Sequence, residues 1–183
     1  MKKLSILAAA ILLFSACSTN NYLVADLGSF KPSSEFTSTK SVYIQSVQDA
    51  RVNKQIVGTR SDKDGNIEKY VVLSSDLRAW FEGALKTQLM QNKISLEDNG
   101  EAAVVDVFIK EFNANLSGFQ TDNLKSNIVV ELRIEKDGKV ITKKLAEPQT
   151  KFVALKTTSV FENIYRDMVN SMVKRVALEI ISE

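Results

Sequence analysis

The stretch NIVVELRIEKDGKVITKKLAE, residues 127–147, decides the fold, because its pattern is that of two strands joined by a tight turn. Asp137-Gly138 at its centre suits a two-residue hairpin loop, in which positive φ angles are needed. Registering the strands about that turn gives five cross-strand pairs: Ile134–Ile141, Leu132–Lys143, Val130–Leu145, Glu131–Lys144 and Arg133–Thr142. The first three pairs share an apolar face and the other two a polar, charge-matched face. One register therefore predicts an antiparallel hairpin with one side on the core.

Other strands are predicted on both sides of this hairpin. Residues 41–51 alternate between apolar and polar at their start, residues 67–73 are apolar and extended in pattern, and residues 101–116 are dense in β-branched side chains. The polar stretch 53–66, with a glycine and an Asp-Gly turn signal, is interpreted as a connection that lets the first two strands pair as a long hairpin. Residues 151–156 are a candidate further strand, whose exposed edge would suit strand addition by a partner.

Two amphipathic helices are predicted, over residues 74–92 and 158–183. Ser74 or Ser75 can cap the first helix, and Asp76 in the first turn suits its dipole. The apolar stripes are Leu77, Trp80, Phe81, Ala84, Leu85 and Leu89 in the first helix, and Phe161, Ile164, Tyr165, Met168, Met172, Val176 and Ile180 in the second. Both stripes need cover, which one-sided strands provide. The expected fold is therefore α+β, a largely antiparallel β-sheet with two long amphipathic helices packed on one face.

The N-terminal residues have the pattern of a secretory signal peptide. Two lysines, Lys2 and Lys3, precede an apolar run over 4–14, and the small residues Ser15 and Ala16 follow. The apolar run is too short to span a bilayer, which takes about 20 residues. The predicted organisation is a cleaved signal peptide at 1–16, a flexible tether at 17–40 rich in Ser, Thr and Asn, and a single domain at 41–183.

The segment Phe14-Ser15-Ala16-Cys17 resembles the lipobox of bacterial lipoproteins. The resemblance departs from the usual pattern in one place, since Phe14 stands where leucine is common. It implies transfer of a diacylglyceryl group to the Cys17 sulfur, cleavage between Ala16 and Cys17, and acylation of the new N-terminus. Several acyl chains hold a protein firmly on a membrane. Ser18, in place of an aspartate after the cysteine, implies sorting to the outer membrane, with the domain facing the periplasm.

Composition excludes several classes of function. The chain has 24 basic and 22 acidic residues, and removal of Lys2 and Lys3 with the signal peptide leaves the mature chain neutral. A neutral chain argues against a nucleic-acid partner, which would require a concentrated basic surface. The chain has no histidine, and its only cysteine, Cys17, is assigned to lipidation. With no nucleophilic motif, phosphate-binding loop or metal-ligand cluster, the sequence predicts no enzyme, no cofactor and no metal.

The sequence also resembles the YajG family of bacterial lipoproteins over most of residues 40–183. The resemblance rests on DAR at 49–51, on LSSDLR at 73–78, and on the helix that continues as LKTQLM at 85–90. A β-rich middle and a final helix complete the order of elements. The family has no settled biochemical activity, so the resemblance implies a location and a topology but no reaction.

Asp49, Arg51, Asp76 and Arg78 are the candidate interaction residues of the domain. Asp49 and Arg51 lie two residues apart on a strand and therefore share a face, while Asp76 and Arg78 begin the helix that follows. Two interpretations stay open. The four residues form a polar recognition patch, or they are ion pairs and caps that fix the strand-to-helix junction.

Two hypotheses of function follow. The preferred one is a noncatalytic accessory or protein-interaction module, held to the membrane by the lipid on Cys17 and bound to an unidentified envelope protein. The alternative is a carrier or adaptor domain that binds a lipid or a glycan between helices and sheet. The alternative predicts a sizeable apolar cavity beneath Trp80 and Phe81, whereas the first predicts a filled core and a surface patch.

Overall fold

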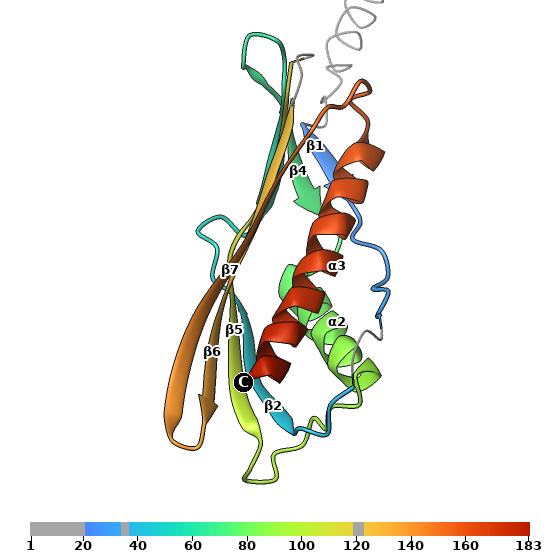
Figure 1. Ribbon diagram of the computed structural model, residues 1–183. Coiled ribbons are helices and arrows are strands. Elements are labelled where there is room, and N and C mark those ends of the chain that lie inside the picture. Colours follow the sequence, from blue (N-terminus) through green and yellow to red (C-terminus); the bar gives the residue numbers. More distant parts are fainter. Residues whose placement is uncertain (1–20, 34–36, 119–122) are drawn as a thin grey trace, which may run out of the picture.

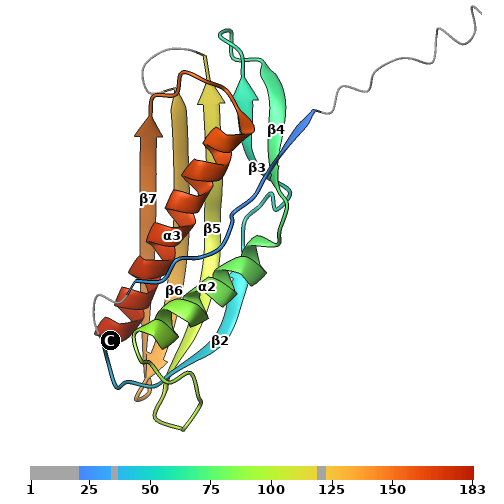
Figure 2. The ribbon, with the colours of Figure 1, turned by 90° about the vertical axis from the view of Figure 1, so that its right-hand side faces the viewer.

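The computed structural model describes residues 21–33, 37–118 and 123–183, so the predicted signal peptide and Cys17 lie outside the described residues. Within these ranges the strands of one seven-stranded sheet are β1 (Tyr22–Ala25), β2 (Val42–Asp49), β3 (Ile56–Ser61), β4 (Ile67–Leu73), β5 (Ala103–Ser117), β6 (Leu124–Lys136) and β7 (Lys139–Lys151). The helices are α2 (Leu77–Gln91) and α3 (Thr158–Ser182). Both helices lie on the same side of the curved sheet (Figures 1 and 2).

The β6–β7 hairpin has the register that the sequence predicts. All five predicted cross-strand pairs are present, from Val130–Leu145 to Ile134–Ile141. At the turn, Asp137 and Gly138 have φ angles of 51° and 70°, as a two-residue loop of this kind requires. β5 pairs antiparallel with the other side of β6, so the three longest strands form one antiparallel block. The expectation of an α+β fold with a largely antiparallel sheet and two helices is confirmed.

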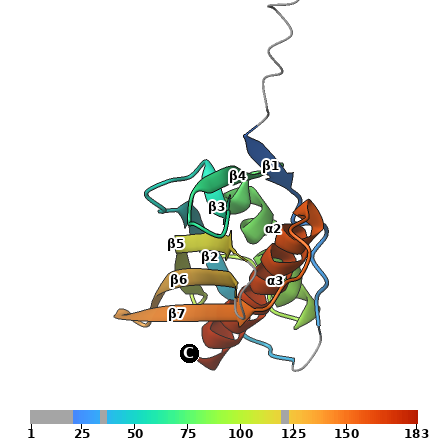
Figure 3. The ribbon, with the colours of Figure 1, turned by 90° about the horizontal axis from the view of Figure 1, so that it is seen from above.

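The other half of the sheet contains parallel pairings that the sequence does not predict. The strands follow the order β1-β4-β3-β5-β6-β7, and β2 also pairs with β5. Both β2 and β3 run parallel to β5 along the same edge, β2 beside residues 103–109 and β3 beside residues 114–117. Residues 50–55 leave the sheet between these two strands. β4 then returns antiparallel to β3, and Figure 3 shows the strands from above.

The predicted long hairpin of residues 41–51 with residues 67–73 is therefore wrong. β3 lies inside the stretch interpreted as a connection, and it occupies the position beside β4. β2 cannot pair with β4, because it lies end to end with β3 on the edge of β5. The candidate strand at 151–156 is also wrong beyond Lys151. β7 continues through Pro148 and ends at Lys151, and an irregular segment leads to α3.

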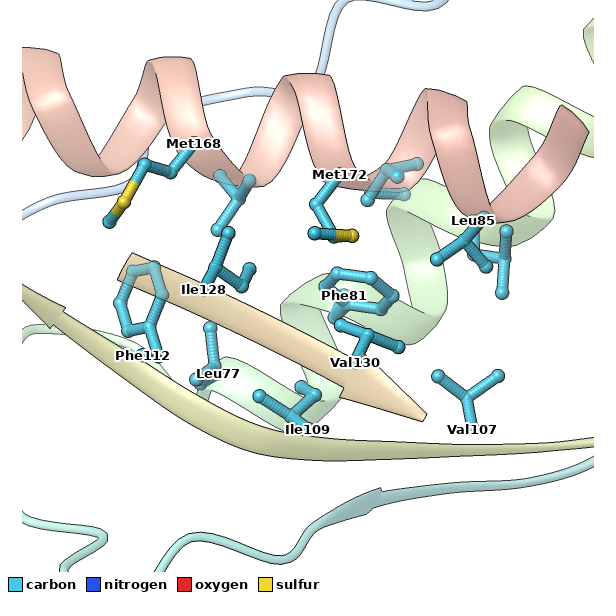
Figure 4. Close-up of a cluster of buried hydrophobic side chains, with 14 of the residues drawn as sticks. Leu77, Phe81, Leu85, Val107, Ile109, Phe112, Ile128, Val130, Met168 and Met172 are labelled. Atoms are coloured by element: carbon cyan, nitrogen blue, oxygen red, sulfur yellow. The ribbon is translucent and has the colours of Figure 1, made fainter. Parts of the chain in front are cut away.

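The core lies between the sheet and the two helices. Figure 4 shows Leu77, Phe81 and Leu85 of α2 and Met168 and Met172 of α3 among side chains of the sheet. Of the thirteen residues predicted for the two stripes, twelve are buried and Trp80 alone is half-buried. Met168 and Met172 are fully buried, so the interpretation of this pair as core is confirmed.

The described residues before β2 pack on the domain, and the prediction of a flexible tether is wrong for residues 21–33. β1 pairs parallel with β4, and Ala25 and Leu27 are fully buried. The chain then crosses the helices as a strap (Figure 2). The Trp80 indole donates a 2.7 Å hydrogen bond to the Gly28 carbonyl. This segment was missed because its alternation of buried and exposed residues, over 23–27, is short and lies within a polar composition.

Candidate functional site

A cleft of about 760 Å³ opens where β2 ends, β4 ends and α2 begins. The four candidate residues of the sequence, Asp49, Arg51, Asp76 and Arg78, all line this cleft. The other lining residues are Tyr22, Val47, Gln48, Lys54, Gln55, Ile56, Val72, Leu73, Ser75 and Leu77. Tertiary structure therefore brings together two pairs of charged residues that lie 27 positions apart in the chain.

The cleft results from a change of direction in the chain after β4. β4 runs antiparallel to β3, so its continuation past Leu73 would lie beside β2. Residues 74–76 instead turn away from the sheet and start α2. Along the described residues, the outer edge of β2 meets only the Ser41–Ser95 bridge at its beginning and pairs with no further strand. The sheet thus has a vacant strand position beside β2, and the cleft lies at its end.

Arg51 and Asp49 form a tightly fixed pair on the floor of the cleft. The guanidinium donates two 2.8 Å hydrogen bonds to the Asp49 carboxylate, from Nε to Oδ1 and from Nη2 to Oδ2. The Arg51 backbone N–H donates to Oδ1 as well. Burial by itself raises the pKa of Asp49, but the hydrogen bonds and charge of Arg51 outweigh it, so the pKa is lowered. The Asp49 carboxylate is therefore held in its ionised form and bound to Arg51.

Arg51 also holds in place residues 50–55, the excursion in which the chain leaves the sheet between β2 and β3. Its Nη2 atom donates a 2.9 Å hydrogen bond to the Lys54 carbonyl, and its Cζ atom lies 6.0 Å from the centre of the Phe112 ring. The Nη1 atom is buried and has no hydrogen-bond partner among the described residues. The excursion consequently presents Val52, which is fully exposed, at a defined place beside the cleft.

Asp76 is the N-cap of α2. Its Oδ1 atom accepts a 2.7 Å hydrogen bond from the Ala79 backbone N–H, so the predicted cap at Ser74 or Ser75 is wrong by one or two residues. Arg78 lies two residues further on and donates a 3.1 Å hydrogen bond to Glu82. Its nearest approach to the Asp76 carboxylate is 3.9 Å. The ion pairs and cap of the second interpretation are thus present, and they surround an open cleft.

Sequence reasoning missed Lys54 and Gln48, which also line the cleft. Neither stands in a recognisable motif, because Lys54 lies in the excursion and Gln48 alternates with buried residues along β2. No carboxylate of the described residues makes an ion pair with the Lys54 ammonium. The cleft is lined by three cations, Arg51, Lys54 and Arg78, and two carboxylates, Asp49 and Asp76, so it carries one positive charge in excess, and Lys54 and Arg78 are exposed. The site therefore favours a ligand group that is anionic.

The space next to Trp80 and Phe81 is filled by protein side chains. Phe81 is fully buried in the core cluster, and Trp80 packs against that cluster from its margin. The Phe30 ring meets the Trp80 indole edge-on at a centroid distance of 6.2 Å. These contacts favour a packed core at this position over the cavity that a lipid or glycan carrier requires.

Two further features bear on the kind of protein. The described part of the chain contains no cluster of three or more cysteine, aspartate or glutamate residues that could hold a metal ion. None of the helices within residues 21–33, 37–118 and 123–183 is long and apolar enough to cross a membrane.

The fold is shared with proteins of known structure. A crystal structure of a Xanthomonas campestris protein of the DUF330 family has a TM-score of 0.59 at 7% identity, with 84% of this chain and 91% of that chain covered. The crystal structure of an uncharacterised protein has a TM-score of 0.53 at 11% identity, over 83% of this chain and 99% of that one. These likenesses define the class as a small α+β domain of one sheet and two helices.

Sequence comparison identifies the family within this class. The model of a family of uncharacterised lipoproteins matches residues 30–183, and the chain belongs to that family. The resemblance to a YajG-like lipoprotein family is thereby confirmed, and membership indicates a membrane-associated location in the cell envelope. A minor lipoprotein from Acinetobacter baumannii is 19% identical, with a TM-score of 0.41 over 56% of this chain and 83% of that chain. No curated protein matches the sequence.

Proposed function

We propose that this lipoprotein is anchored in the outer membrane through Cys17 and faces the periplasm, where its noncatalytic domain binds an extended segment of an envelope protein. The segment would occupy the vacant strand position beside β2 and end in the cleft. Membership of a lipoprotein family supports the anchor. The observation that carries the binding role is the turn of the chain after Leu73, which leaves the outer edge of β2 without a strand.

The chemistry of this position favours an extended peptide with an acidic group. A strand edge offers backbone hydrogen bonds in a regular row, and an added strand uses them irrespective of its sequence. Selectivity would come from the cleft, where Lys54 and Arg78 are exposed and the carboxylates of Asp49 and Asp76 are already engaged. Val52 at the edge of the cleft offers an apolar contact.

The carrier hypothesis has less support. Its cavity would have to lie beneath Trp80 and Phe81, and the core fills that space. The cleft at the β2–α2 junction lies outside the core and is rimmed by charged groups, which suits a peptide better than an acyl chain.

Photo-crosslinking in living cells tests the proposed interaction. A photoreactive amino acid at Gln48, exposed and in the cleft, is expected to give a discrete adduct with an envelope protein. The same amino acid at Thr142, exposed on β7, provides the matched control. Adding Lys54→Glu is expected to weaken the Gln48 adduct, whereas Lys144→Glu on β7 is expected to leave it unchanged. Equal adducts at both positions, or none at Gln48, would refute the proposal.

A further inference from the structure

The end of the domain at which β7 meets α3 exposes two large apolar side chains on a fixed loop. Phe152 and Leu155 are 58% and 71% exposed. Single exposed apolar residues are common on protein surfaces and require no special explanation. Phe152 and Leu155 differ because hydrogen bonds hold the backbone of the loop that bears them. This fixed backbone keeps both side chains exposed.

Two sets of hydrogen bonds hold this loop. The buried Asn123 side chain bonds both the N–H and the carbonyl of Val153, each at 2.8 Å. Farther along, Arg60 donates to the Lys156 carbonyl at 3.1 Å, and the Lys156 ammonium donates to the Ser61 carbonyl at 2.9 Å. Phe152 directly precedes the first attachment, at Val153, and Leu155 lies between Val153 and Lys156. Because the loop is rigid there, both side chains stay exposed.

Strand register places this loop level with the point where the N-terminal segment enters the sheet. Tyr22 pairs with Tyr70, which directly follows Lys69. From Lys69 one row of partners crosses the sheet through Arg60, Leu116, Leu124 and Lys151. Lys151 is the residue before Phe152. In Figures 1 and 2, β1 and the β7–α3 loop accordingly lie at the same end of the molecule.

The length of the chain before Asn21 limits how far the lipid can be from this end. Cys17 precedes Asn21 by four residues, which span at most about 14 Å when fully extended. Across the row, β1 and β7 are five strand spacings apart, or about 24 Å. A connection shorter than the width of the domain end keeps that end close to the bilayer surface.

We infer that this end of the domain, with Phe152, Leu155 and the 51%-exposed Ile67, is a second membrane contact that inserts apolar side chains into the interface of the bilayer. The inference rests on the lipid anchor at Cys17 in the proposed function. Ile67 belongs to this end because it pairs with Ser61, which bonds Lys156. The two-point attachment sets the orientation of the domain, with the long β6–β7 hairpin directed away from the membrane.

Site-specific fluorescence tests this contact. In the lipidated protein the Cys17 sulfur is alkylated, so a cysteine introduced by Phe152→Cys or Leu155→Cys is the only thiol available for an environment-sensitive NBD label. Val140→Cys is the matched control, because Val140 is 51% exposed at the hairpin end of β7, about 40 Å from the end of that strand at Lys151. The protein is reconstituted in vesicles of phosphatidylethanolamine and phosphatidylglycerol, and circular dichroism checks that each variant is folded.

The label at residue 152 or 155 is expected to give blue-shifted, several-fold brighter emission than the label at residue 140, and to be quenched by lipids with a spin label on the acyl chain. Equal, unquenched emission at both ends of vesicle-bound protein would overturn the inference. So would an emission change that appears only when envelope proteins are added, since that result indicates a protein partner. Labelling of the wild-type chain would instead show a free Cys17, and would count against the proposed anchor itself.

Discussion

The phenolic hydroxyl of Tyr165 donates a 2.6 Å hydrogen bond to the Val57 carbonyl, across 108 positions of the chain. This bond joins α3 to β3, and the group that makes it is fully buried. Burial raises the pKa of the Tyr165 phenol above its ordinary value, which favours the protonated hydroxyl that donates this bond. The contact fixes the strand that separates β4 from β5 and thereby sets the position of the cleft.

Tyr165→Phe is expected to destabilise the domain by about 1–3 kcal/mol, because the buried Val57 carbonyl would lose its side-chain donor. Chemical denaturation followed by circular dichroism measures the change. Tyr43→Phe is the control, since Tyr43 is partly exposed on β2 and its hydroxyl makes no hydrogen bond within the described residues. Equal effects of the two variants would contradict the role assigned to the Tyr165–Val57 bond.

Gly58→Ala is expected to cost at least about 3 kcal/mol or to prevent folding, because overpacking here meets backbone that cannot move aside. A Cβ atom at residue 58 would overlap the Ala114 carbonyl oxygen of β5 and lie 2.5 Å from the Tyr165 hydroxyl. Gly83→Ala provides the opposite case. Gly83 lies within α2, and a Cβ atom added there would meet open space, so alanine should stabilise the helix by about 1 kcal/mol. Thermal unfolding distinguishes the two outcomes.

Asp76→Ala is expected to lower stability by about 1 kcal/mol, since the Ala79 N–H would lose its acceptor at the start of α2. Asp76→Asn keeps a capping oxygen and should retain most of that stability. The asparagine variant also removes a negative charge from the cleft without disturbing the junction. It is therefore expected to preserve the Gln48 photo-adduct, and loss of both stability and adduct in Asp76→Asn would show that the charge, and not the cap, is needed.

Asp49→Asn is expected to reduce the dependence of stability on acid pH. The folded-state pKa of Asp49 is lowered from its ordinary value of 3.8, so ionised Asp49 stabilises the folded protein at neutral pH. That contribution is lost as the pH falls through 3.8 toward the lowered value, where the folded carboxylate is finally protonated. Unfolding free energies at about pH 7 and about pH 3 should differ less in Asp49→Asn than in the unmodified chain. An unchanged difference would mean that the Arg51 pair does not shift this group.

Cys17→Ser is expected to leave the domain folded but to release it from the membrane fraction, because the lipid is the firm attachment and the contact of Phe152 and Leu155 alone is weak. Fractionation of cells, with circular dichroism of the purified variant, measures both properties. Ser18→Ala is the control for a neighbouring change and should stay in the membrane fraction. A Cys17→Ser protein that still sediments with membranes would contradict the lipid anchor.

Local patterns in the sequence were sufficient for the β6–β7 hairpin and for both helices. In each case the signal is periodic and short in range: the Asp137-Gly138 turn fixes one register, and stripes at helical spacing mark the buried faces. The sequence also identified Asp49, Arg51, Asp76 and Arg78 as candidates, although it left their role open. Family comparison confirmed the lipoprotein class, while lipidation of Cys17 remains a prediction.

Only the tertiary structure decided how β1, β2 and β3 are arranged and that a cleft exists. Parallel pairing with β5 depends on contacts between distant residues, such as Gly58 beside Ala114, and such contacts leave no local period in the sequence. From the sequence alone, Gly58 is interpreted as part of a polar connection. Its lack of a side chain is what lets β3 approach β5 and Tyr165 closely. The sequence by itself determined the β6–β7 hairpin, the two helices and the charged candidates, because those follow from local periodicity and residue type. The charged residues lie together at one vacant strand position because of the packing of the whole chain.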